Sequence, residues 1–321
     1  MKKTSPKEEL FDLSKLTVRP LGERTHDLDL SVIRPLQKVP VQLPSIRAVA
    51  NRIRKARDKK ASIVLMMGAH VLRSGVQRYL IDLMEKGYIS CLAMNGAGLI
   101  HDYELALIGA TTESVAHYIA DGQFGLWKET GDINEIVSQA AAEDLGMGYA
   151  AGRAIEEGSL PHREISVLAA GYRLGIPVTI HVGIGYDIVH EHPNCNGAAY
   201  GASSYTDFLK YTHVMERLEG GVVMNFGSSI MGPEVYLKAL AMVRNVAQSE
   251  GRSIRHFATL VCDLVELPDN FRQEAPRTSP GYYYRPWKTM LVRTVADGGE
   301  SFYVRAPHAD TLPQLWSALQ P

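Results

Sequence analysis

An apolar run leads directly into glycines and ionisable side chains in the stretch Ile89-Ser90-Cys91-Leu92-Ala93-Met94-Asn95-Gly96-Ala97-Gly98-Leu99-Ile100-His101-Asp102-Tyr103-Glu104. The first six residues are typical of a buried strand, because the run is short, mostly apolar and followed by turn residues. A polar turn at the carboxyl end of such a strand is where open α/β sheets place their ligands. The stretch therefore predicts a strand of a parallel sheet with a small-molecule site at its end.

The same arrangement occurs a second time further along the chain. The apolar run Ile176-Pro177-Val178-Thr179-Ile180 is followed by His181-Val182-Gly183-Ile184-Gly185-Tyr186-Asp187-Ile188-Val189-His190-Glu191-His192. The carboxyl ends of parallel strands lie at one edge of a sheet, so we expect the two polar segments to enclose a shared cavity.

Apolar strands alternate with amphipathic helices along most of the chain. We predict strands at residues 62–67, 89–94, 176–181, 220–226, 254–261, 289–295 and 301–304. We predict helices at residues 45–59, 75–86, 102–107, 133–157, 161–171, 205–218, 233–246 and 312–319. This alternation implies parallel strands joined by right-handed crossovers, and therefore a doubly wound, mostly parallel α/β sheet of the Rossmann-like type.

The first 44 residues have a different character from the rest of the chain. Five prolines between residues 6 and 44 forbid long helices there. We therefore expect an extended N-terminal arm at residues 1–44, which wraps the surface or a neighbouring subunit, and a single α/β domain at residues 45–321.

The composition of the 321-residue chain, with 45% hydrophobic and 21% charged residues, is ordinary for a globular protein with a sizeable core. A formal net charge of −1 predicts no attraction to nucleic acid or to an anionic membrane. No apolar run approaches the roughly 20 residues of a membrane-spanning helix, and the N-terminus does not resemble a secretory signal. The three cysteines, Cys91, Cys195 and Cys262, are too few for a disulfide framework, which favours a reducing cytoplasm.

Two strand-to-helix transitions are candidates for holding a nucleotide. In Gly68-Ala69-His70-Val71-Leu72-Arg73-Ser74-Gly75, free backbone amides suit a phosphate or carboxylate, and Arg73 would add charge-assisted hydrogen bonds. A plain turn is the alternative, because the glycine spacing does not match the dinucleotide-binding fingerprint. In Asn225-Phe226-Gly227-Ser228-Ser229, small residues would let a nucleotide approach the backbone.

Three ionisable side chains, His101, Asp102 and Glu104, follow the turn Asn95-Gly96-Ala97-Gly98. His101 beside Asp102 is a candidate acid–base group whose carboxylate partner sets its tautomer. Acidic residues in the first turn of a helix also stabilise the helix dipole, so Asp102 and Glu104 have a structural alternative.

The densest cluster of ionisable groups comprises His181, Asp187, His190, Glu191, His192 and Cys195. Imidazole, carboxylate and thiolate are the ligands that Zn²⁺ prefers. However, His190 and His192 are two residues apart, which is not the helical His-Glu-x-x-His spacing. A loop that holds the amine or carboxylate of a ligand is the favoured interpretation, and a metal site and a structural loop are the alternatives.

A lysine near the C-terminus is a further candidate. Lys288 follows Trp287 after the longest predicted loop, at residues 268–286. A lysine desolvated by aromatic neighbours can form an imine, whereas a surface lysine with a buried stem is the structural alternative.

The order of these segments over residues 62–319 is similar to that in deoxyhypusine synthase and its bacterial relatives. Residues Ala69–Arg73 resemble the NAD loop of that family, Asn95–Gly98 its Thr-Ala-Gly-Gly turn, and Phe226–Ser228 its Gly-Gly-Gly strand end. Gly185–Asp187 resembles its aspartate-bearing loop, and Trp287-Lys288 resembles its catalytic Trp-Gly-Lys, one residue shorter. The resemblance implies a Rossmann-like NAD-binding fold and a homotetramer with active sites between subunits. It also implies oxidation of a polyamine by NAD with group transfer through a lysine imine.

The chain departs from that family at the substrate. The paired glutamates that hold the polyamine there fall near Ile100 and His101, and the family's Gly-Ser-Asp stretch has no clear counterpart. The pattern from Asn95 to Glu104 also resembles NAD-using proteins that handle ornithine and arginine, which indicates an amino acid or amine as substrate.

The favoured hypothesis is an NAD-dependent enzyme that oxidises an amine or amino acid to an imine, with or without group transfer. The residues expected to hold NAD are Gly68, Ala69, His70, Arg73, Asn95, Gly96, Ala97, Gly98, Gly227 and Ser228. Proton transfer and imine formation are assigned to His101, Asp102 and Lys288, and binding of the cationic substrate to Glu104, Asp187, His190 and Glu191. The alternatives are a hydrolase with a metal held by His181, Asp187, His190 and His192, and a sensor that binds a nucleotide or amine without turnover.

Overall fold

A parallel sheet of six strands, in the order β5-β3-β2-β6-β7-β8, forms the centre of the computed structural model, which describes residues 9–321. The strands are β2 (Ile63–Met67), β3 (Cys91–Asn95), β5 (Val178–His181), β6 (Val222–Phe226), β7 (Ala258–Asp263) and β8 (Glu300–Arg305). Counted along the chain, this is the Rossmann order 3-2-1-4-5-6. The predicted doubly wound α/β class is confirmed.

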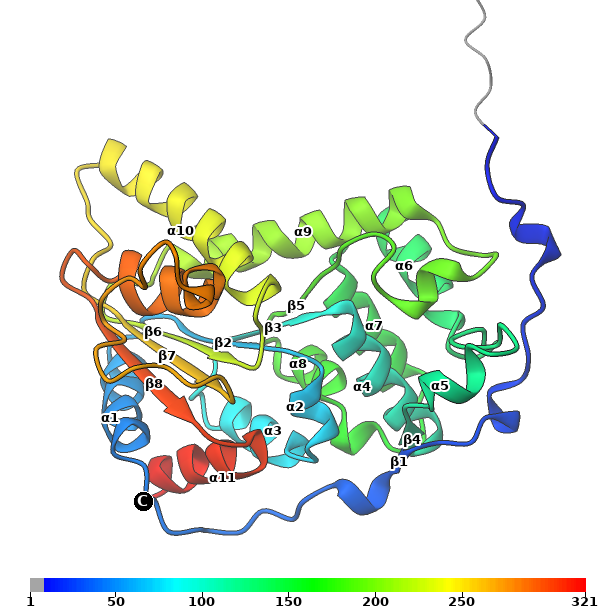
Figure 1. The fold of residues 1–321 in the computed structure, drawn as a ribbon, viewed down its shortest axis with the longest axis horizontal. Coiled ribbons are helices and arrows are strands. Elements are labelled where there is room, and N and C mark those ends of the chain that lie inside the picture. The colour runs from blue at the N-terminus through cyan, green and yellow to red at the C-terminus, as the bar shows by residue number, and fades with distance from the viewer. Residues whose placement is uncertain (1–8) are drawn as a thin grey trace, which may run out of the picture.

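Helices cover both faces of the sheet (Figure 1). The lower face in that view packs against α1 (Pro44–Asp58), α3 (Gln77–Glu85) and α11 (His308–Leu319), and the upper face against α9 (Gly197–Met215) and α10 (Met231–Ser249). Along β2, Ile63, Leu65 and Met67 belong to the lower core, whereas Val64 and Met66 belong to the upper one. Because both faces are covered, β2, β3 and β6 are nearly continuous apolar runs rather than alternating ones.

Most of the remaining helices lie beside the sheet, on the side of β5. Seven helical segments gather there or near the strand ends: α2 (His70–Arg73), α4 (Gly96–Ile108), α5 (Val115–Tyr118), α6 (Asp132–Ala142), α7 (Met147–Glu157), η4 (Arg163–Ile165) and α8 (Val167–Leu174). The short helix η5 (Ile188–Glu191) follows β5, and the short helix η6 (Pro280–Tyr283) directly precedes η7 (Pro286–Arg293). No helix among residues 9–321 has both the length and the apolar character needed to cross a bilayer.

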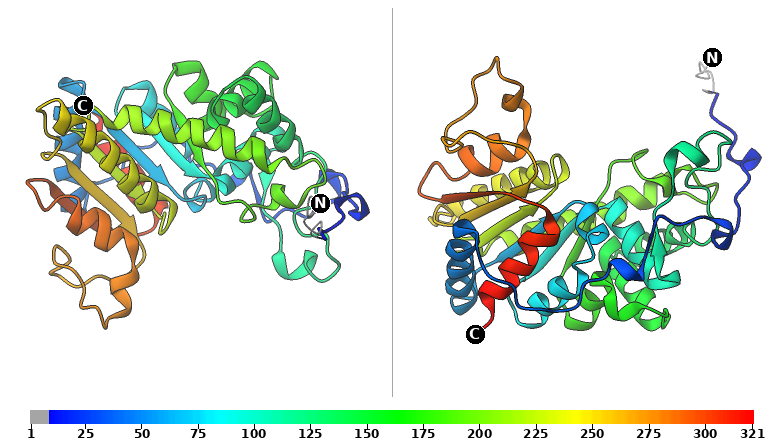
Figure 2. Two further views of the ribbon diagram at one scale, coloured as in Figure 1. Left: turned by 90° about the horizontal axis from the view of Figure 1, so that it is seen from above. Right: turned by 60° about the horizontal axis from the view of Figure 1, so that its bottom comes forward.

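The N-terminal segment runs across the surface of its own chain, as the blue trace in Figures 1 and 2 shows. It contains three short 3-10 helices, η1 (Leu13–Lys15), η2 (Leu21–Glu23) and η3 (Leu30–Val32), and the strand β1 (Leu28–Asp29), which pairs antiparallel with β4 (Ala110–Thr111). Farther along, Arg34 N–H donates to the carbonyl of Gly75 and Val39 N–H donates to Ser317 Oγ. Residues 1–8 of the predicted arm lie outside the described residues, and the division into an arm and one domain stays a prediction.

The strand predicted at residues 289–295 is wrong. These residues belong to η7 (Pro286–Arg293), a π-helix that packs against α10, β7 and β8 and buries Trp287, Met290 and Leu291. A short apolar run such as Met290-Leu291-Val292 has no periodicity that distinguishes a strand from a buried helix.

Several predicted helices have different bounds; the one predicted at 205–218, for example, is α9 (Gly197–Met215). The helix predicted at residues 133–157 is two helices, α6 and α7, because Asp144 between them adopts φ of 56°. The helix predicted at 161–171 is η4 followed by α8, whose N-terminus is capped by the Ser166 hydroxyl. The helix predicted at 102–107 begins at Gly96, so the predicted Asn-Gly-Ala-Gly turn is the first turn of α4.

In the edge strand β5, side chains of α9 satisfy the backbone N–H and C=O of Ile180. Asp207 Oδ2 accepts hydrogen bonds from the N–H of Ile180 in β5 and of Gly148 in α7, each at 2.9 Å. The Ser204 hydroxyl donates to the carbonyl of Ile180 and accepts from Val182 N–H. An unpaired edge invites pairing with another chain, and these side chains block that pairing.

Asp207 should make stability depend on pH. Burial raises the pKa of its carboxyl to about 7, whereas an unfolded aspartate releases its proton near pH 4. The folded state therefore binds the additional proton between these values, and the stabilising contribution is lost as the pH rises through about 7. We expect Asp207→Asn, whose amide oxygen can accept the same two bonds, to gain stability over the parent as the pH rises from about 4 to about 7. Urea unfolding at several pH values tests this, and a pH-independent difference between the two proteins would contradict it.

Candidate functional site

The carboxyl ends of neighbouring strands meet at one edge of the sheet. Met67 of β2 pairs with Met94 of β3 and with Phe226 of β6, and Asn95 of β3 pairs with His181 of β5. The polar turns that follow these strands in the sequence are therefore neighbours in space, as expected from parallel pairing.

Two glycines, Gly68 and Gly227, follow β2 and β6, where the strand order of the sheet reverses. A Cβ atom on Gly68 would lie 2.6 Å from the carbonyl oxygen of Gly227. Gly227 has φ of 65°, and a Cβ atom there would overlap the ring of His308. Only glycine fits at both positions, and this point of a doubly wound sheet is where dinucleotides bind.

A cavity of about 290 Å³ lies at the same edge, beyond the end of β3. Five residues predicted from the sequence line it: Arg73, Ala97, His101, Glu104 and Asp187. Arg24 and Glu113, which the sequence did not single out, also line it, together with Phe124 and Tyr186. The cavity is thus built from the turns after β2, β3 and β5 together with the N-terminal segment.

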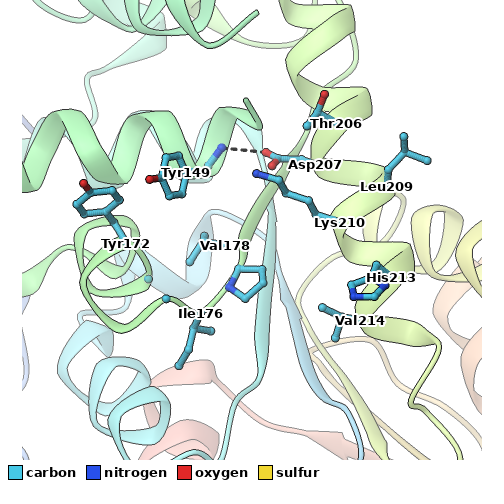
Figure 3. A pocket seen from close by; sticks show the side chains of 14 residues that line it. Tyr149, Tyr172, Ile176, Val178, Thr206, Asp207, Leu209, Lys210, His213 and Val214 are labelled. Carbon is cyan, nitrogen blue, oxygen red and sulfur yellow. Dashed lines mark hydrogen bonds between the residues drawn. The ribbon is translucent and has the colours of Figure 1, made fainter. Parts of the chain in front are cut away.

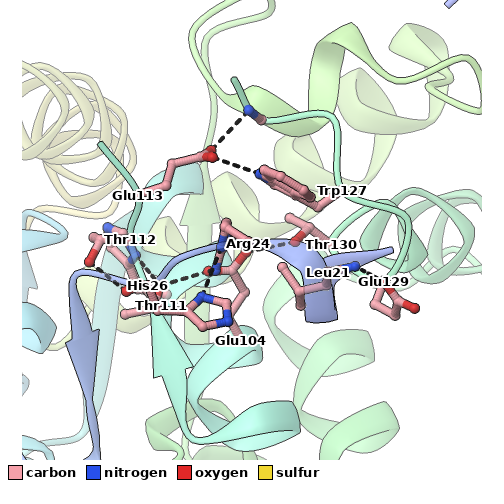
Figure 4. Close-up of polar contacts among 12 residues, drawn as sticks. Leu21, Arg24, His26, Glu104, Thr111, Thr112, Glu113, Trp127, Glu129 and Thr130 are labelled. Atoms are coloured by element: carbon pink, nitrogen blue, oxygen red, sulfur yellow. Dashed lines mark hydrogen bonds and ion pairs between the residues drawn. The ribbon is translucent and has the colours of Figure 1, made fainter. Parts of the chain in front are cut away.

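Arg24 and Glu104, which both line the cavity, form a buried ion pair (Figure 4). Both guanidinium Nη atoms donate to the two carboxylate oxygens at 2.8 Å, and each side chain is 1% exposed. The hydroxyls of Thr130 and Thr111 donate to the same carboxylate at 2.6 and 2.7 Å. Burial alone would raise the pKa of Glu104, but Arg24 and the two hydroxyls hold it below its usual value.

This pairing corrects the role predicted for Glu104. Its carboxylate receives four hydrogen bonds from the protein, so it anchors the N-terminal segment rather than offering a free charge to a cationic substrate. Arg24 precedes Glu104 by 80 residues, and no local pattern in the sequence connects them.

His101 is paired with a hydroxyl and not with the carboxylate predicted for it. Its Nδ1 lies 2.8 Å from Thr111 Oγ1. Burial lowers the pKa of His101 to about 4, so the ring is neutral near pH 7. Because the ring lines the cavity and Nδ1 is engaged, Nε2 is the nitrogen left for a ligand.

Asp102 faces away from the cavity, which corrects the predicted His101–Asp102 pair. Its buried carboxylate accepts hydrogen bonds from Ser166 Oγ at 2.5 Å and from the N–H groups of Val167 and Leu168 at 3.0 and 3.1 Å. Burial raises the pKa of Asp102 to about 6. Successive residues on a helix point in different directions, so Asp102 caps α8 while His101 reaches the cavity.

Asp187 lies against the first turn of α4. A Cβ atom on Gly96 would overlap its carboxylate, which accepts a hydrogen bond from the backbone N–H of Ala97. Burial raises the pKa of Asp187 to about 6. The side chain of Asn95 caps the same helix by accepting from Gly98 N–H at 3.2 Å. The first turn of α4, predicted to contact NAD, thus already holds a carboxylate of the chain.

The histidines of the second polar segment point to different partners. His181 Nε2 lies 3.0 Å from Thr179 Oγ1, and His192 Nε2 donates to the carbonyl of Gly125 at 2.8 Å. His190 Nδ1 accepts from the N–H groups of Gly185 and Asp187, both at 3.2 Å, and so shapes the turn that carries Asp187.

The ligand set predicted for a metal is therefore not formed. Within the part of the chain that the structure describes, no group of three or more His, Cys, Asp or Glu side chains could hold a metal ion. Glu191 lies beside Gly125 and outside the cavity, and burial raises its pKa to about 6.

Lys288, Ser228 and His70 also lie outside the cavity. Lys288 is on η7, where its Nζ lies 3.5 Å from the centre of the Tyr282 ring. Ser228 Oγ accepts from Gly232 N–H at 2.8 Å and so supports the start of α10. His70 contacts Arg73, with Nε2 and Nη1 3.3 Å apart, while the buried Nε of Arg73 has no partner among residues 9–321.

A second hollow, of about 550 Å³, lies outside β5 between α7, α8 and α9 (Figure 3). Its walls are mostly apolar, with Tyr149, Tyr172 and Lys210 at the rim. The carboxylate of Asp207 in this hollow is engaged by backbone N–H groups. None of the residues predicted from the sequence as site residues lines it.

Comparison with known proteins supports the fold. Residues 47–145 match the family model described as arginine dihydrolase ArgZ-like, C-terminal, Rossmann fold. The apo structure of ArgZ, an arginine dihydrolase from the ornithine–ammonia cycle in cyanobacteria, has a TM-score of 0.50 and 17% identity over 86% of this chain and 32% of that chain. Unliganded AgrE has a TM-score of 0.51 and 17% identity over 88% of this chain and 34% of its own.

A conserved putative LOR/SDH protein from Methanococcus maripaludis S2 is also similar, with a TM-score of 0.50 and 16% identity over 89% of this chain and 73% of that one. The chain spans about a third of the length of the ArgZ and AgrE chains. No curated protein sequence matches it significantly. At these identities the solved structures share the fold alone.

The resemblance to deoxyhypusine synthase is supported in its fold only. The Rossmann fold that it implied is confirmed, and the matching family model is ArgZ-like. A putative deoxyhypusine synthase from Entamoeba histolytica has a TM-score of 0.40 and 11% identity. The homotetramer that the resemblance implied stays a prediction.

Proposed function

We propose that this chain is an NAD-dependent enzyme that oxidises a small amino acid or amine at the carbon bearing nitrogen. One observation carries the proposal: turns from three strands bring Arg73, His101 and Asp187 to one cavity at the carboxyl edge of the sheet, where the strand order also reverses. A cation, a neutral acceptor and a carboxylate in one small cavity match the carboxylate and ammonium groups of an amino acid.

The carboxyl ends of β2 and β6 are the proposed NAD site. Gly68 and Gly227 let the backbone pack closely at these two strand ends, and they lie at the reversal of the strand order, where doubly wound sheets bind dinucleotides. When bound there, NAD would supply the acceptor for a hydride. In Rossmann proteins an acidic residue at the end of the second strand commonly holds the ribose. Here that position is Asn95, a helix cap, and a carboxylate from the segment after β5, Asp187, lies against the next residue, Gly96.

The residues of the cavity would bind and orient the amino acid. Arg73, with an unpartnered Nε, would hold the substrate carboxylate, and Asp187 would attract its ammonium group. His101 stays neutral near pH 7, so its Nε2 would accept a hydrogen bond from that ammonium group. Transfer of a proton from the ammonium group to His101 Nε2 would free the nitrogen lone pair. Loss of a hydride from the adjacent carbon to NAD would then leave an iminium group, in which that lone pair forms the C=N bond.

The proposal predicts separable binding sites for NAD and the amino acid. We expect NAD to raise the unfolding temperature, since a ligand at 100 times its Kd stabilises by about 2.7 kcal/mol. Ornithine and arginine are the amino acids to test first, because the matching family model is named for an arginine dihydrolase. Arg73→Met should weaken amino-acid binding by about 10- to 100-fold, the value of a charge-assisted hydrogen bond, without changing NAD affinity. Calorimetry measures both.

Arg78→Met is the matched control, because Arg78 is an exposed arginine of α3 and should change neither affinity. If Arg73→Met instead lost NAD and retained the amino acid, the cavity would be part of the cofactor site. Binding of both ligands without reduction of NAD would favour the non-catalytic sensor. No binding of NAD at millimolar concentration would overturn the proposal.

A further inference from the structure

The orientation of one hydroxyl determines which nitrogen of His101 carries the hydrogen, and therefore whether Nε2, on the cavity side, donates or accepts. We infer that Thr111 is a positioning residue that locks His101 in the tautomer with hydrogen on Nδ1 and presents the Nε2 lone pair to the cavity. The inference rests on the proposed function only for the identity of the ligand that uses this lone pair.

The argument begins with the single hydrogen of the Thr111 hydroxyl. Thr111 Oγ1 lies 2.7 Å from Glu104 Oε2 and 2.8 Å from His101 Nδ1, so it must donate to one and accept from the other. An ionised carboxylate can only accept. The hydroxyl therefore donates to Glu104, and its oxygen accepts from the N–H of His101 Nδ1.

The reverse orientation is disfavoured by burial. If Thr111 donated to His101, then its oxygen and Glu104 Oε2 would be two acceptors 2.7 Å apart without a hydrogen between them. A buried acceptor without a donor costs about 1–3 kcal/mol. A proton on Glu104 would remove the conflict, but both oxygens of this carboxylate are held by Arg24, which favours the charged form.

The N-terminal segment therefore decides the tautomer of a residue far along the chain. Arg24 keeps Glu104 ionised, and Leu28 of β1 pairs with Thr111 of β4 and fixes its backbone. In the series of hydrogen bonds from Arg24 through Glu104 and Thr111 to His101, each bond pairs a donor with an acceptor within the series. In histidines generally, the hydrogen-bond partner of one ring nitrogen decides whether the other nitrogen is protonated.

The tautomer can be observed directly in the full-length protein without any ligand. Two-bond proton–nitrogen correlation spectra of histidine-labelled protein at neutral pH distinguish the two forms, and His101→Gln assigns the signals. We expect His101 to carry its hydrogen on Nδ1 in the parent and in Thr111→Ser. Thr111→Val keeps the shape but removes the hydroxyl, so the hydrogen should move to Nε2 in most molecules. We expect about a 10-fold loss of amino-acid affinity in that variant and recovery in Thr111→Ser.

Thr179→Val is the matched control. Thr179 Oγ1 lies 3.0 Å from His181 Nε2, and this pair is not part of the cavity. The substitution should change the His181 signals and leave those of His101 and the ligand affinity unchanged. A parent protein with the hydrogen on Nε2 of His101, or a Thr111→Val variant with an unchanged tautomer, would overturn the inference. If the tautomer is as expected but neither NAD nor an amino acid binds, the proposed function fails and the assignment of Thr111 stands.

Discussion

Arg24→Met is expected to lower the free energy of unfolding by about 3–5 kcal/mol, measured by urea unfolding near neutral pH. The substitution leaves the Glu104 carboxylate buried without its counter-charge, although Thr111 and Thr130 still donate to it. The desolvation of a charge is repaid only by a partner of good geometry, and Arg24 is the cation that contacts Glu104. The loss should be large because both side chains are 1% exposed.

The control is the same substitution at an exposed pair of similar geometry. Arg52 donates to both carboxylate oxygens of Glu300, but the two side chains are 39% and 48% exposed. Arg52→Met should therefore cost at most about 1 kcal/mol. Adding Glu104→Gln to Arg24→Met should restore part of the loss, since it removes the uncompensated charge. Equal losses at Arg24 and Arg52 would show that burial does not strengthen this ion pair.

Gly75→Ala is expected to cost about 2–5 kcal/mol, because two separate penalties combine. Gly75 has φ of 74°, where a Cβ atom costs about 1–2 kcal/mol. That Cβ atom would also overlap the carbonyl oxygen of Val32, so two backbone segments must separate, at about 1–3 kcal/mol. Because Arg34 N–H donates to the Gly75 carbonyl, the N-terminal segment should loosen at this point. Denaturant unfolding and hydrogen exchange of the Arg34 amide measure the two effects.

Gly175→Ala isolates the conformational penalty. Gly175 has φ of 67° at the end of α8, and a Cβ atom there would have no neighbour within 4 Å. It should cost only about 1–2 kcal/mol and leave exchange of the Arg34 amide unchanged. If the two alanine variants are equally stable, the contact between Gly75 and Val32 does not hold the N-terminal segment in place.

The framework of the site was predictable from the sequence. Strands covered on both faces are continuous apolar runs, so β2, β3 and β6 could be recognised without knowledge of their neighbours. Parallel strands place their carboxyl ends at one edge, so the turns at Gly68, Asn95 and Gly227 had to be neighbours. Close approach of backbone at Gly68 and Gly227 requires glycine, and that requirement is visible in the residue type itself.

The partners of the ionisable groups were decided by tertiary structure. Adjacent in sequence, His101 and Asp102 diverge on α4, and each takes the partner that packing brings to it. Glu104 takes Arg24 from the N-terminal segment, and the histidines near Asp187 separate to backbone and hydroxyl partners. A buried polar atom must find a donor or acceptor within about 3 Å, and which one lies there depends on segments far apart in the chain. The spacing of ionisable residues in the sequence does not show which partner lies within that distance. The pattern of apolar residues, in contrast, shows which positions are buried.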